Sequence, residues 1–163
     1  MLRTSYGCLA VLAVAAAMPA QEWFRVEPDA SPAARRFHSM VFDGQRNVIV
    51  LFGGADERLG KLFGDTWEFD GVTWKSKTIP GPSPRSRHAA CYDSVRGRVL
   101  VFGGADTNGK PLNDTWAFDG KTWTAIAGNL PNHPINVVVQ DRKNRNLLIV
   151  GNDVGVFLSV DAG

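Results

Sequence analysis

Residues 85–123 read RSRHAACYDSVRGRVLVFGGADTNGKPLNDTWAFDGKTW, and residues 35–74 read RRFHSMVFDGQRNVIVLFGGADERLGKLFGDTWEFDGVTW. Ten residues of the earlier stretch return 50 positions later, and eight more return 49 positions later. The matched residues of the earlier copy are Arg35, His38, Asp43, Arg46, Phe52, Gly53, Gly54, Ala55, Asp56, Leu62, Asp65, Thr66, Trp67, Phe69, Asp70, Gly71, Thr73 and Trp74. So many matches in order indicate an internal repeat, and a period near 50 points to solenoids or propellers.

Each copy predicts four short strands. In the first copy the apolar or β-branched runs lie at residues 40–42, 48–52 and 66–69 and around Trp74, and in the second at 89–92, 98–102 and 115–118 and around Trp123. The Asp-Gly pairs at 70–71 and 119–120 are strong hairpin signals. No segment after the N-terminal one has a sustained 3.6-residue apolar period. The sequence therefore predicts an all-β fold in which each copy forms one antiparallel four-stranded sheet.

These residues resemble the kelch family of β-propellers, whose blades include those of the galactose oxidase central domain. The resemblance covers about residues 32–126 and rests on a glycine pair, an aromatic residue in the third strand and a tryptophan in the fourth. Those residues are Gly53, Gly54, Trp67, Trp74, Gly103, Gly104, Trp116 and Trp123. The resemblance implies structural roles for them: the glycines turn the backbone where φ is positive, and the tryptophans pack between blades.

A third unit departs from the pattern. Residues 131–134 replace the arginine motif, while residues 137–150 still read as the same hairpin. The final stretch, with Ser159, Asp161 and Gly163, resembles the start of an Asp-box repeat of sialidase and sortilin propellers, in which the aspartate organises a turn. We expect kelch blades at 35–79 and 80–128 and a partial Asp-box-like blade at 129–163. Because propellers close with about four to eight blades, we expect an incomplete propeller that needs further blades or other copies.

The N-terminus has a different character. Arg3 precedes the unbroken apolar run from Leu9 to Ala17, which is typical of a secretory signal and too short for a membrane span. We expect cleavage near Ala20, a linker or strand at 21–34, and a secreted or periplasmic protein. The chain of 163 residues carries a formal charge of only +2, so neither nucleic acid nor, after cleavage, a membrane is an expected partner.

Few residues suggest chemistry. The candidates for ligand contact are Arg35, Arg36, His38, Arg85, Arg87 and His88, which precede the innermost strand of each predicted blade. Guanidinium groups there could bind a carboxylate and the imidazoles could bind a metal. Their recurrence in one slot of the repeat favours a structural role, so no metal and no cofactor is predicted. A galactose oxidase copper centre is excluded because Cys91 and Tyr92, as neighbours on a strand, point to opposite faces.

The pattern thus predicts a binding scaffold without catalysis of its own, with an unknown protein or glycan as its ligand. The expected contact surfaces are the loops 56–64 and 106–113 and the arginine-bearing segments beside them, because function concentrates in loops on a rigid scaffold. The alternative is that the chain is the N-terminal part of a secreted carbohydrate-active enzyme, galactose-oxidase-like or sialidase-like, whose catalytic residues lie elsewhere.

Overall fold

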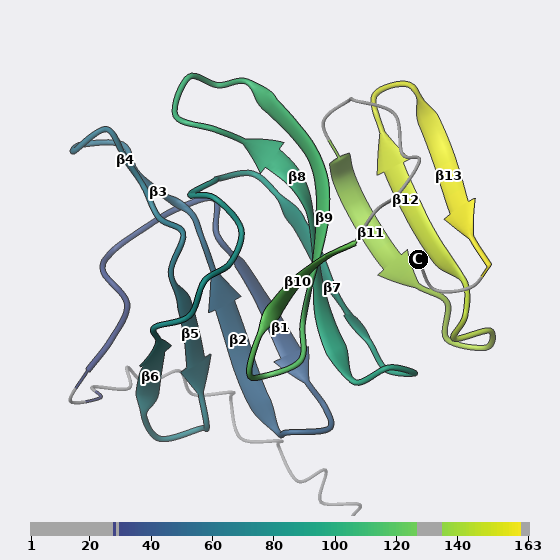
Figure 1. Cartoon of the computed structure of the whole chain (residues 1–163), viewed down its shortest axis with the longest axis horizontal. Coiled ribbons are helices and arrows are strands. Elements are labelled where there is room, and N and C mark those ends of the chain that lie inside the picture. The colour runs from purple at the N-terminus through teal and green to yellow at the C-terminus, as the bar shows by residue number, and fades with distance from the viewer. Residues whose placement is uncertain (1–27, 29, 127–134, 161–163) are drawn as a thin grey trace, which may run out of the picture.

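The computed structural model describes residues 28, 30–126 and 135–160, and in this part of the chain all regular structure is β-strand (Figure 1). The strands form three larger antiparallel sheets that stand side by side, together with one small ribbon. The sheets that the described residues form do not close into a ring. The predicted fold class, with blade-like antiparallel sheets of an incomplete propeller, is confirmed.

Blades 1 and 2 are the two four-stranded sheets. Blade 1 contains β1 (Ser39–Asp43), β2 (Val48–Phe52), β5 (Thr66–Phe69) and β6 (Trp74–Lys77), in that spatial order. Blade 2 contains β7 (Ala89–Asp93), β8 (Arg98–Ala105), β9 (Pro111–Phe118) and β10 (Trp123–Ile126) in the same order. Blade 3 has three described strands, β11 (Ile135–Gln140), β12 (Leu148–Asn152) and β13 (Gly155–Ser159). The first strands of the blades, β1, β7 and β11, lie next to one another.

A recurring aspartate turn sets the register of the first hairpin in each blade. Asp43 and Asp93 are fully buried, and each accepts hydrogen bonds through Oδ1 from the backbone N–H groups two and three residues later. Asp141 forms the same turn in blade 3. The side chain thereby satisfies turn donors that have no strand partner. The third hairpin has therefore kept the turn chemistry of the first two.

The predicted polar loops at 56–64 and 106–113 contain short paired strand segments, which corrects that part of the sequence interpretation. In blade 1 the segment forms the ribbon β3 (Ala55–Asp56) and β4 (Lys61–Leu62). In blade 2, β8 and β9 run on past the glycine pair with an irregularity in register after Phe102. Polar side chains did not prevent pairing because the hydrogen bonds of a ribbon are made by the backbone.

Two apolar layers hold the blades together. Alternate residues of each strand point to opposite faces of its sheet. We call the face on the side of the preceding blade the front face, and the face on the side of the following blade the back face. Between blades 1 and 2 the buried residues are Val50, Phe52, Val99, Val101, Phe118 and Trp123. Between blades 2 and 3 they are Leu100, Phe102, Ala117, Ile135, Val138, Leu148 and Val150.

The two fourth-strand tryptophans have different surroundings. Trp123 lies between blades, where its ring stacks on Phe118 and contacts Phe52, and its Nε1 donates to Thr66 Oγ1. The Trp74 ring packs at a tilt against Phe69 and is only half-buried. The predicted signal at 1–20, the segment 131–134, and Asp161 and Gly163 of the Asp-box resemblance lie outside the described residues.

Candidate functional site

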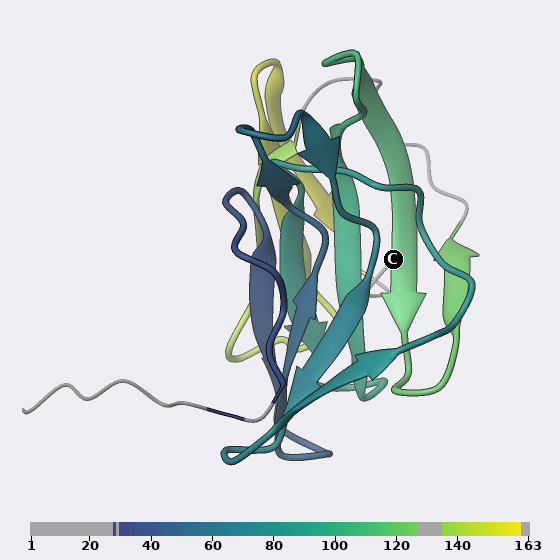
Figure 2. The same cartoon turned by 90° about the vertical axis from the view of Figure 1, so that its left-hand side faces the viewer.

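Four segments meet at one end of the molecule and form a surface that we call the ribbon rim. It consists of the lead-in segments 35–38 and 85–88, the β3–β4 ribbon at 55–62, and the tip of the β8–β9 hairpin at 105–111. Figures 1 and 2 both place the ribbon and the hairpin at the same end. Single antiparallel bridges join Arg36 to Ala55 and Ser86 to Ala105, so each lead-in segment is fastened to the ribbon of its own blade.

Arg35 and Arg85 are internal ties of this rim. The Arg85 guanidinium is fully buried and donates to Gly103 O at 2.9 Å and to both carboxylate oxygens of Asp114 at 2.5 and 2.8 Å. Arg35 makes the same contacts with Gly53 O and Asp65. Such bidentate pairs are strong because both groups are charged and their geometry matches. Both arginines thus fix the glycine pair to the third strand and are withdrawn from the surface.

These contacts lower the pKa values of the two acidic partners, Asp65 and Asp114. Burial alone would raise the pKa of Asp65, but hydrogen bonds from Arg35 and from the Trp67 indole outweigh it and lower the pKa. Asp114 is lowered for the same reason by Arg85 and Trp116. Both carboxylates therefore stay ionised, and each also orients a third-strand tryptophan.

The two histidines sit against the glycine pairs. A Cβ on Gly54 would lie 2.9 Å from His38 Cβ, and a Cβ on Gly104 would lie 2.9 Å from His88 Cβ. The carbonyl oxygens of Arg36 and Ser86 would lie equally close, at 2.9 and 2.7 Å, so the second glycine of each pair makes room for the lead-in backbone and the histidine Cβ. His88 Nε2 shares a hydrogen bond of 2.8 Å with Ser39 Oγ of blade 1. Burial, followed by the charges of Arg85 and His38, lowers the pKa of His88 to about 4, so this imidazole is neutral at physiological pH.

The histidine arrangement does not match a catalytic or metal site in the part of the chain that is described. The Nδ1 atoms of His38 and His88 are buried and have no hydrogen-bond partner there. If Ser39 were a nucleophile, His88 would be its base, and a third group would have to orient His88 through Nδ1. Among the described residues no group bonds to His88 Nδ1. No cluster of three or more potential metal ligands occurs among the described residues. The Ser39–His88 contact is accordingly a polar bond across the junction of blades 1 and 2.

Arg36, Phe37 and Arg87 form the exposed part of the rim. The Arg36 and Arg87 guanidinium carbons lie 4.9 and 4.6 Å from the centroid of the Phe37 ring, which is 39% exposed. Phe37 and Arg87 occupy the same slot of successive repeats, and both have φ of 58°. Left-handed backbone at residues other than glycine costs about 1–3 kcal/mol and concentrates at functional sites. Arg87 N–H donates to Phe37 O at 3.0 Å, which helps to hold this geometry.

Two grooves flank this cluster. One, of about 500 Å³, lies between the first lead-in segment and the base of the ribbon and includes Arg36 and Glu57 in its lining. The other, of about 350 Å³, lies between the ribbon and the β8–β9 hairpin and includes Phe37, Arg87 and Asp106. An Arg36–Glu57 ion pair crosses the first groove. The rim thus presents charges of both signs around an exposed aromatic ring.

The structure brings together the predicted loops and the predicted arginine segments. It places some of the candidate residues in the interior and others on the surface. Arg35, Arg85 and His88 point inward, His38 is half-buried, and Arg36 and Arg87 are exposed. The sequence interpretation did not single out Phe37, nor the pairing of Asp65 with Arg35. The pairing had a signal, since Asp65 and Arg35 recur together as Asp114 and Arg85. Phe37 had none, because its counterpart is an arginine.

Comparison with known proteins agrees with this geometry. Blades of four antiparallel strands, glycine pairs at the ends of the second strands and tryptophans between sheets define kelch-type blades. The KLHDC2/KLHL20/DRC7 Kelch-repeats domain family matches residues 13–152, and the chain belongs to the kelch-repeat family.

Individual relatives match a shorter segment. Kelch domain-containing protein 3 of Bos taurus and of Homo sapiens is each 42% identical over 65 residues, and the Rattus norvegicus protein is 40% identical. These matches cover 37% of this chain and 16% of each relative. The chain therefore matches about a sixth of the length of these relatives.

None of the described segments contains a helix of the length and apolarity needed to span a membrane.

Proposed function

We propose that the chain is a binding scaffold for a protein or a glycan, that it has no catalysis of its own, and that the ribbon rim is its contact surface. The observation that carries this proposal is the exposed cluster of Arg36, Phe37 and Arg87 between two grooves. Membership of the kelch-repeat family supports the role of a protein-binding scaffold. Nothing in the described residues favours the alternative of a galactose-oxidase-like or sialidase-like enzyme.

The physical basis of this role is a rigid frame beneath a chemically varied surface. The Arg35–Asp65 and Arg85–Asp114 pairs, in which the arginine side chains are buried, hold the lead-in segments. The exposed side chains therefore lose little further backbone freedom when they bind. Guanidinium groups can bind carboxylates bidentately, and an exposed ring can stack on a sugar or an apolar side chain. The rim thus suits acidic peptides or carbohydrate.

The test is a screen with defined probes. The purified chain is applied to a random peptide library and to a glycan array, beside an Arg36→Glu/Arg87→Glu variant. A Lys121→Glu variant is the control, because Lys121 is exposed in the β9–β10 turn at the opposite end of blade 2. Wild type and control should select the same ligands, and the rim variant should lose them at least tenfold. Ligands that survive the rim variant, or the absence of any selected ligand, would contradict the proposal.

Export by residues 1–20 is a separate part of the proposal. Replacement of Leu12 and Val14 by aspartate should keep the product unprocessed and inside the cell, because charges interrupt the apolar run of the signal. Fractionation with N-terminal sequencing checks this result. Normal export of that variant would refute the assignment.

A further inference from the structure

The tip of the β8–β9 hairpin contains the only asparagine of the sequence that a glycine follows directly, Asn108 before Gly109. The tip is a tight turn in which Gly109 N–H donates to Asp106 O at 3.0 Å and Gly109 has φ of 74°. The ribbon of blade 1 ends in a matching turn, where Gly60 has φ of 60° and Leu59 stands in the place of Asn108. The turn therefore needs the glycine for its left-handed backbone, but it does not need the asparagine.

The Asn108 side chain is exposed, and no hydrogen bond to a described residue holds its amide group. The acceptor of the turn is Asp106, whose Oδ1 takes hydrogen bonds from Asn108 N–H at 2.8 Å and from Lys110 N–H at 2.9 Å. The backbone nitrogen that follows Asn108 belongs to Gly109, which has no Cβ to shield it. The space around Gly109 is also open, since a Cβ built there would have no atom within 4 Å. The Asn108 amide can therefore rotate freely toward an unshielded backbone nitrogen.

This arrangement favours ring closure between the two residues. Local opening of a loop tip costs little free energy, and it releases Gly109 N–H from Asp106. The Gly109 nitrogen gives its proton to hydroxide and attacks Asn108 Cγ, so that the N–Cγ bond forms and the Cγ–Nδ2 bond breaks. The Nδ2 group takes a proton from water and leaves as ammonia. Asparagine counts among the thermolabile residues of proteins, and this closure is a reaction of the chain with water alone.

Water then opens the cyclic imide at one of its two carbonyl carbons. Opening at Cγ gives aspartate at position 108. Opening at the main-chain carbonyl carbon gives isoaspartate, in which the backbone runs through Cβ and Cγ and is longer by one methylene group. Both products carry a new carboxylate in place of the amide.

The three Asp-Gly pairs of the sequence lack these features. Asp43, Asp70 and Asp119 each precede a glycine, and each fixes its carboxyl group by accepting through Oδ1 from the backbone N–H groups two and three residues later. Those backbone hydrogen bonds lower the pKa values of Asp70 and Asp119. An ionised and fixed carboxylate is a poor target for a nucleophile, so the aspartate turns are protected where Asn108 is not.

Modification at Asn108 changes the second groove of the ribbon rim, which Asp106, Thr107 and Gly109 help to line. The bonds from Gly109 N–H to Asp106 O and from Lys110 N–H to Asp106 Oδ1 depend on the length of backbone between donor and acceptor. An added methylene group displaces both donors. The new carboxylate also lies close in sequence to Asp106, and like charges repel.

We propose that Asn108 is a site of spontaneous modification, and that its conversion to aspartate or isoaspartate remodels the hairpin tip and the groove beside it. The chemistry depends on the turn and not on any ligand of the rim, so it holds whether or not the rim is a binding surface. The ribbon on the other side of the groove, with Leu59 in the same slot, cannot react in this way.

The test is incubation of the full chain in mildly alkaline buffer, followed by peptide mapping with mass spectrometry. A synthetic peptide of residues 104–113 is the unfolded reference. The fragment that contains Asn108 should gain one mass unit at a rate within tenfold of the peptide, and labelling by an isoaspartyl methyltransferase should appear in the same fragment. A slower rate would show that the folded turn protects Asn108. That result, or equal modification at another asparagine or at an Asp-Gly pair, would overturn the proposal.

Two variants test the roles of the two residues. Asn108→Leu copies the ribbon tip of blade 1 and should gain no mass in this fragment. Gly109→Asn places a residue that tolerates left-handed backbone but adds a Cβ beside the attacking nitrogen, and it should slow modification of Asn108 at least fivefold. An unchanged rate in Gly109→Asn would mean that the Gly109 nitrogen is not the nucleophile.

Hydrogen exchange before and after incubation tests the remodelling. The amides of Gly109 and Lys110 should exchange at least tenfold faster in the isoaspartate form, because their turn bonds to Asp106 are lost. The amides of Gly60 and Lys61 in the ribbon of blade 1 are the control and should not change. Equal exchange at the hairpin tip in both forms would refute the structural part of the proposal.

Discussion

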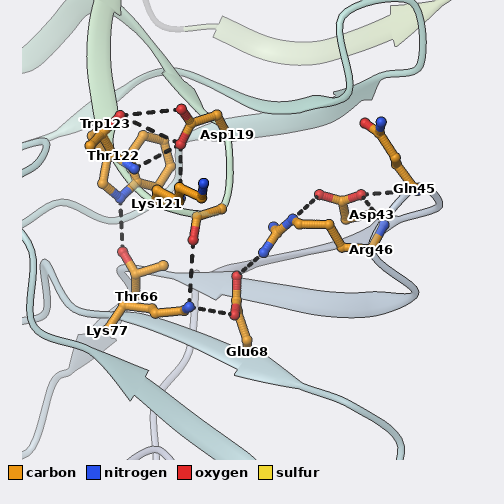
Figure 3. Close-up of polar contacts among 11 residues, drawn as sticks. Asp43, Gln45, Arg46, Thr66, Glu68, Lys77, Asp119, Lys121, Thr122 and Trp123 are labelled. Carbon is orange, nitrogen blue, oxygen red and sulfur yellow. Dashed lines mark hydrogen bonds and ion pairs between the residues drawn. The ribbon is translucent and has the colours of Figure 1, made fainter.

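The junction between blades 1 and 2 and the junction between blades 2 and 3 join the same two kinds of face but use different side chains. The first combines an apolar layer with a polar latch, in which Glu68 accepts from Arg46 and Lys77 while Lys77 also reaches Gly120 O (Figure 3). In the second, the positions of Glu68 and Lys77 are taken by Ala117 and Ile126, which join the apolar layer.

The junctions share one polar feature. A backbone N–H of the first turn donates to the side chain of the next blade: Gln45 N–H to Tyr92 Oη, and Ser94 N–H to Gln140 Oε1. The comparison shows that the repeat requires a packed layer and a capped turn, whereas the interior of the layer can be ionic or apolar. The ion pairs and hydrogen bonds of the latch require particular distances and angles in the first junction. At the same positions the second junction depends on the fit of its apolar side chains.

The largest expected loss of stability follows from a substitution in the glycine pair of the first junction. Gly53 has φ of 64°, and a Cβ there would lie 2.8 Å from Arg85 O and 2.9 Å from His88 Cε1. Gly53→Val should therefore lower the free energy of unfolding by more than about 4 kcal/mol, or prevent folding. Gly71→Val is the control for backbone strain alone, because φ is also positive there but the space is empty. Urea unfolding compares them, and equal losses would contradict the role of the close contact.

Removing a large side chain from one junction at a time should show whether the two junctions unfold independently. Trp123→Ala should cost about 3–5 kcal/mol and Leu148→Ala about 2–5 kcal/mol, because each leaves a cavity in a packed layer. Hydrogen exchange read by strand should show faster exchange in β1, β2 and β7 for the first variant, and in β11 and β12 for the second. The same pattern of exchange in both variants would mean that the blades unfold as one unit and that the junctions are not independent.

Acid should weaken the first junction more than the second. The pKa of His88 is lowered to about 4, so the unfolded chain binds a proton there near pH 6.5 and the folded chain does not. Stability is complete above about pH 6.5, falls as the pH drops toward 4, and loses at most about 3 kcal/mol from this group. Blade 3 has Asn136 at the corresponding position.

The variant that checks this pH dependence is His88→Gln. It should unfold in urea with little pH dependence between 4 and 6.5, apart from a smaller contribution of His38, whose pKa is also lowered by burial. Should the slope of wild type persist in His88→Gln, the pH dependence would have to come from other groups.

The smallest expected effect comes from the latch. Glu68→Ala leaves Arg46 and Lys77 without their shared carboxylate and should cost about 1–3 kcal/mol. Glu68→Ala/Lys77→Ile converts these positions to the residues of blade 2, and it should recover part of that loss because a matched apolar pair replaces an ionic one. A double-mutant cycle by urea unfolding gives the coupling between the two sites. Purely additive losses would show that Glu68 and Lys77 do not act together.

The accuracy of the sequence interpretation varied with the range of the interactions involved. The strands, the hairpin turns and the absence of helix in the described residues follow from local patterns such as the aspartate turns at Asp43, Asp93 and Asp141. The ribbons at 55–62 and 105–111 were predicted as loops, because their polar composition hides backbone pairing. The arginines were treated as one group, although Arg35 is buried and the next residue, Arg36, is exposed. A pattern of residue types does not say which of two neighbours meets a carboxylate 30 positions away.

The chain by itself determined the repeat, the four-strand unit and the positions where glycine is needed, because these depend on spacing and turn chemistry within about 50 residues. Tertiary structure alone decided what each repeated position does. Trp74 and Trp123 occupy the same slot, yet one is half-buried and the other lies between two sheets. The physical reason is that burial depends on the sheet that stands opposite, and similar local sequences carry no information about that neighbour.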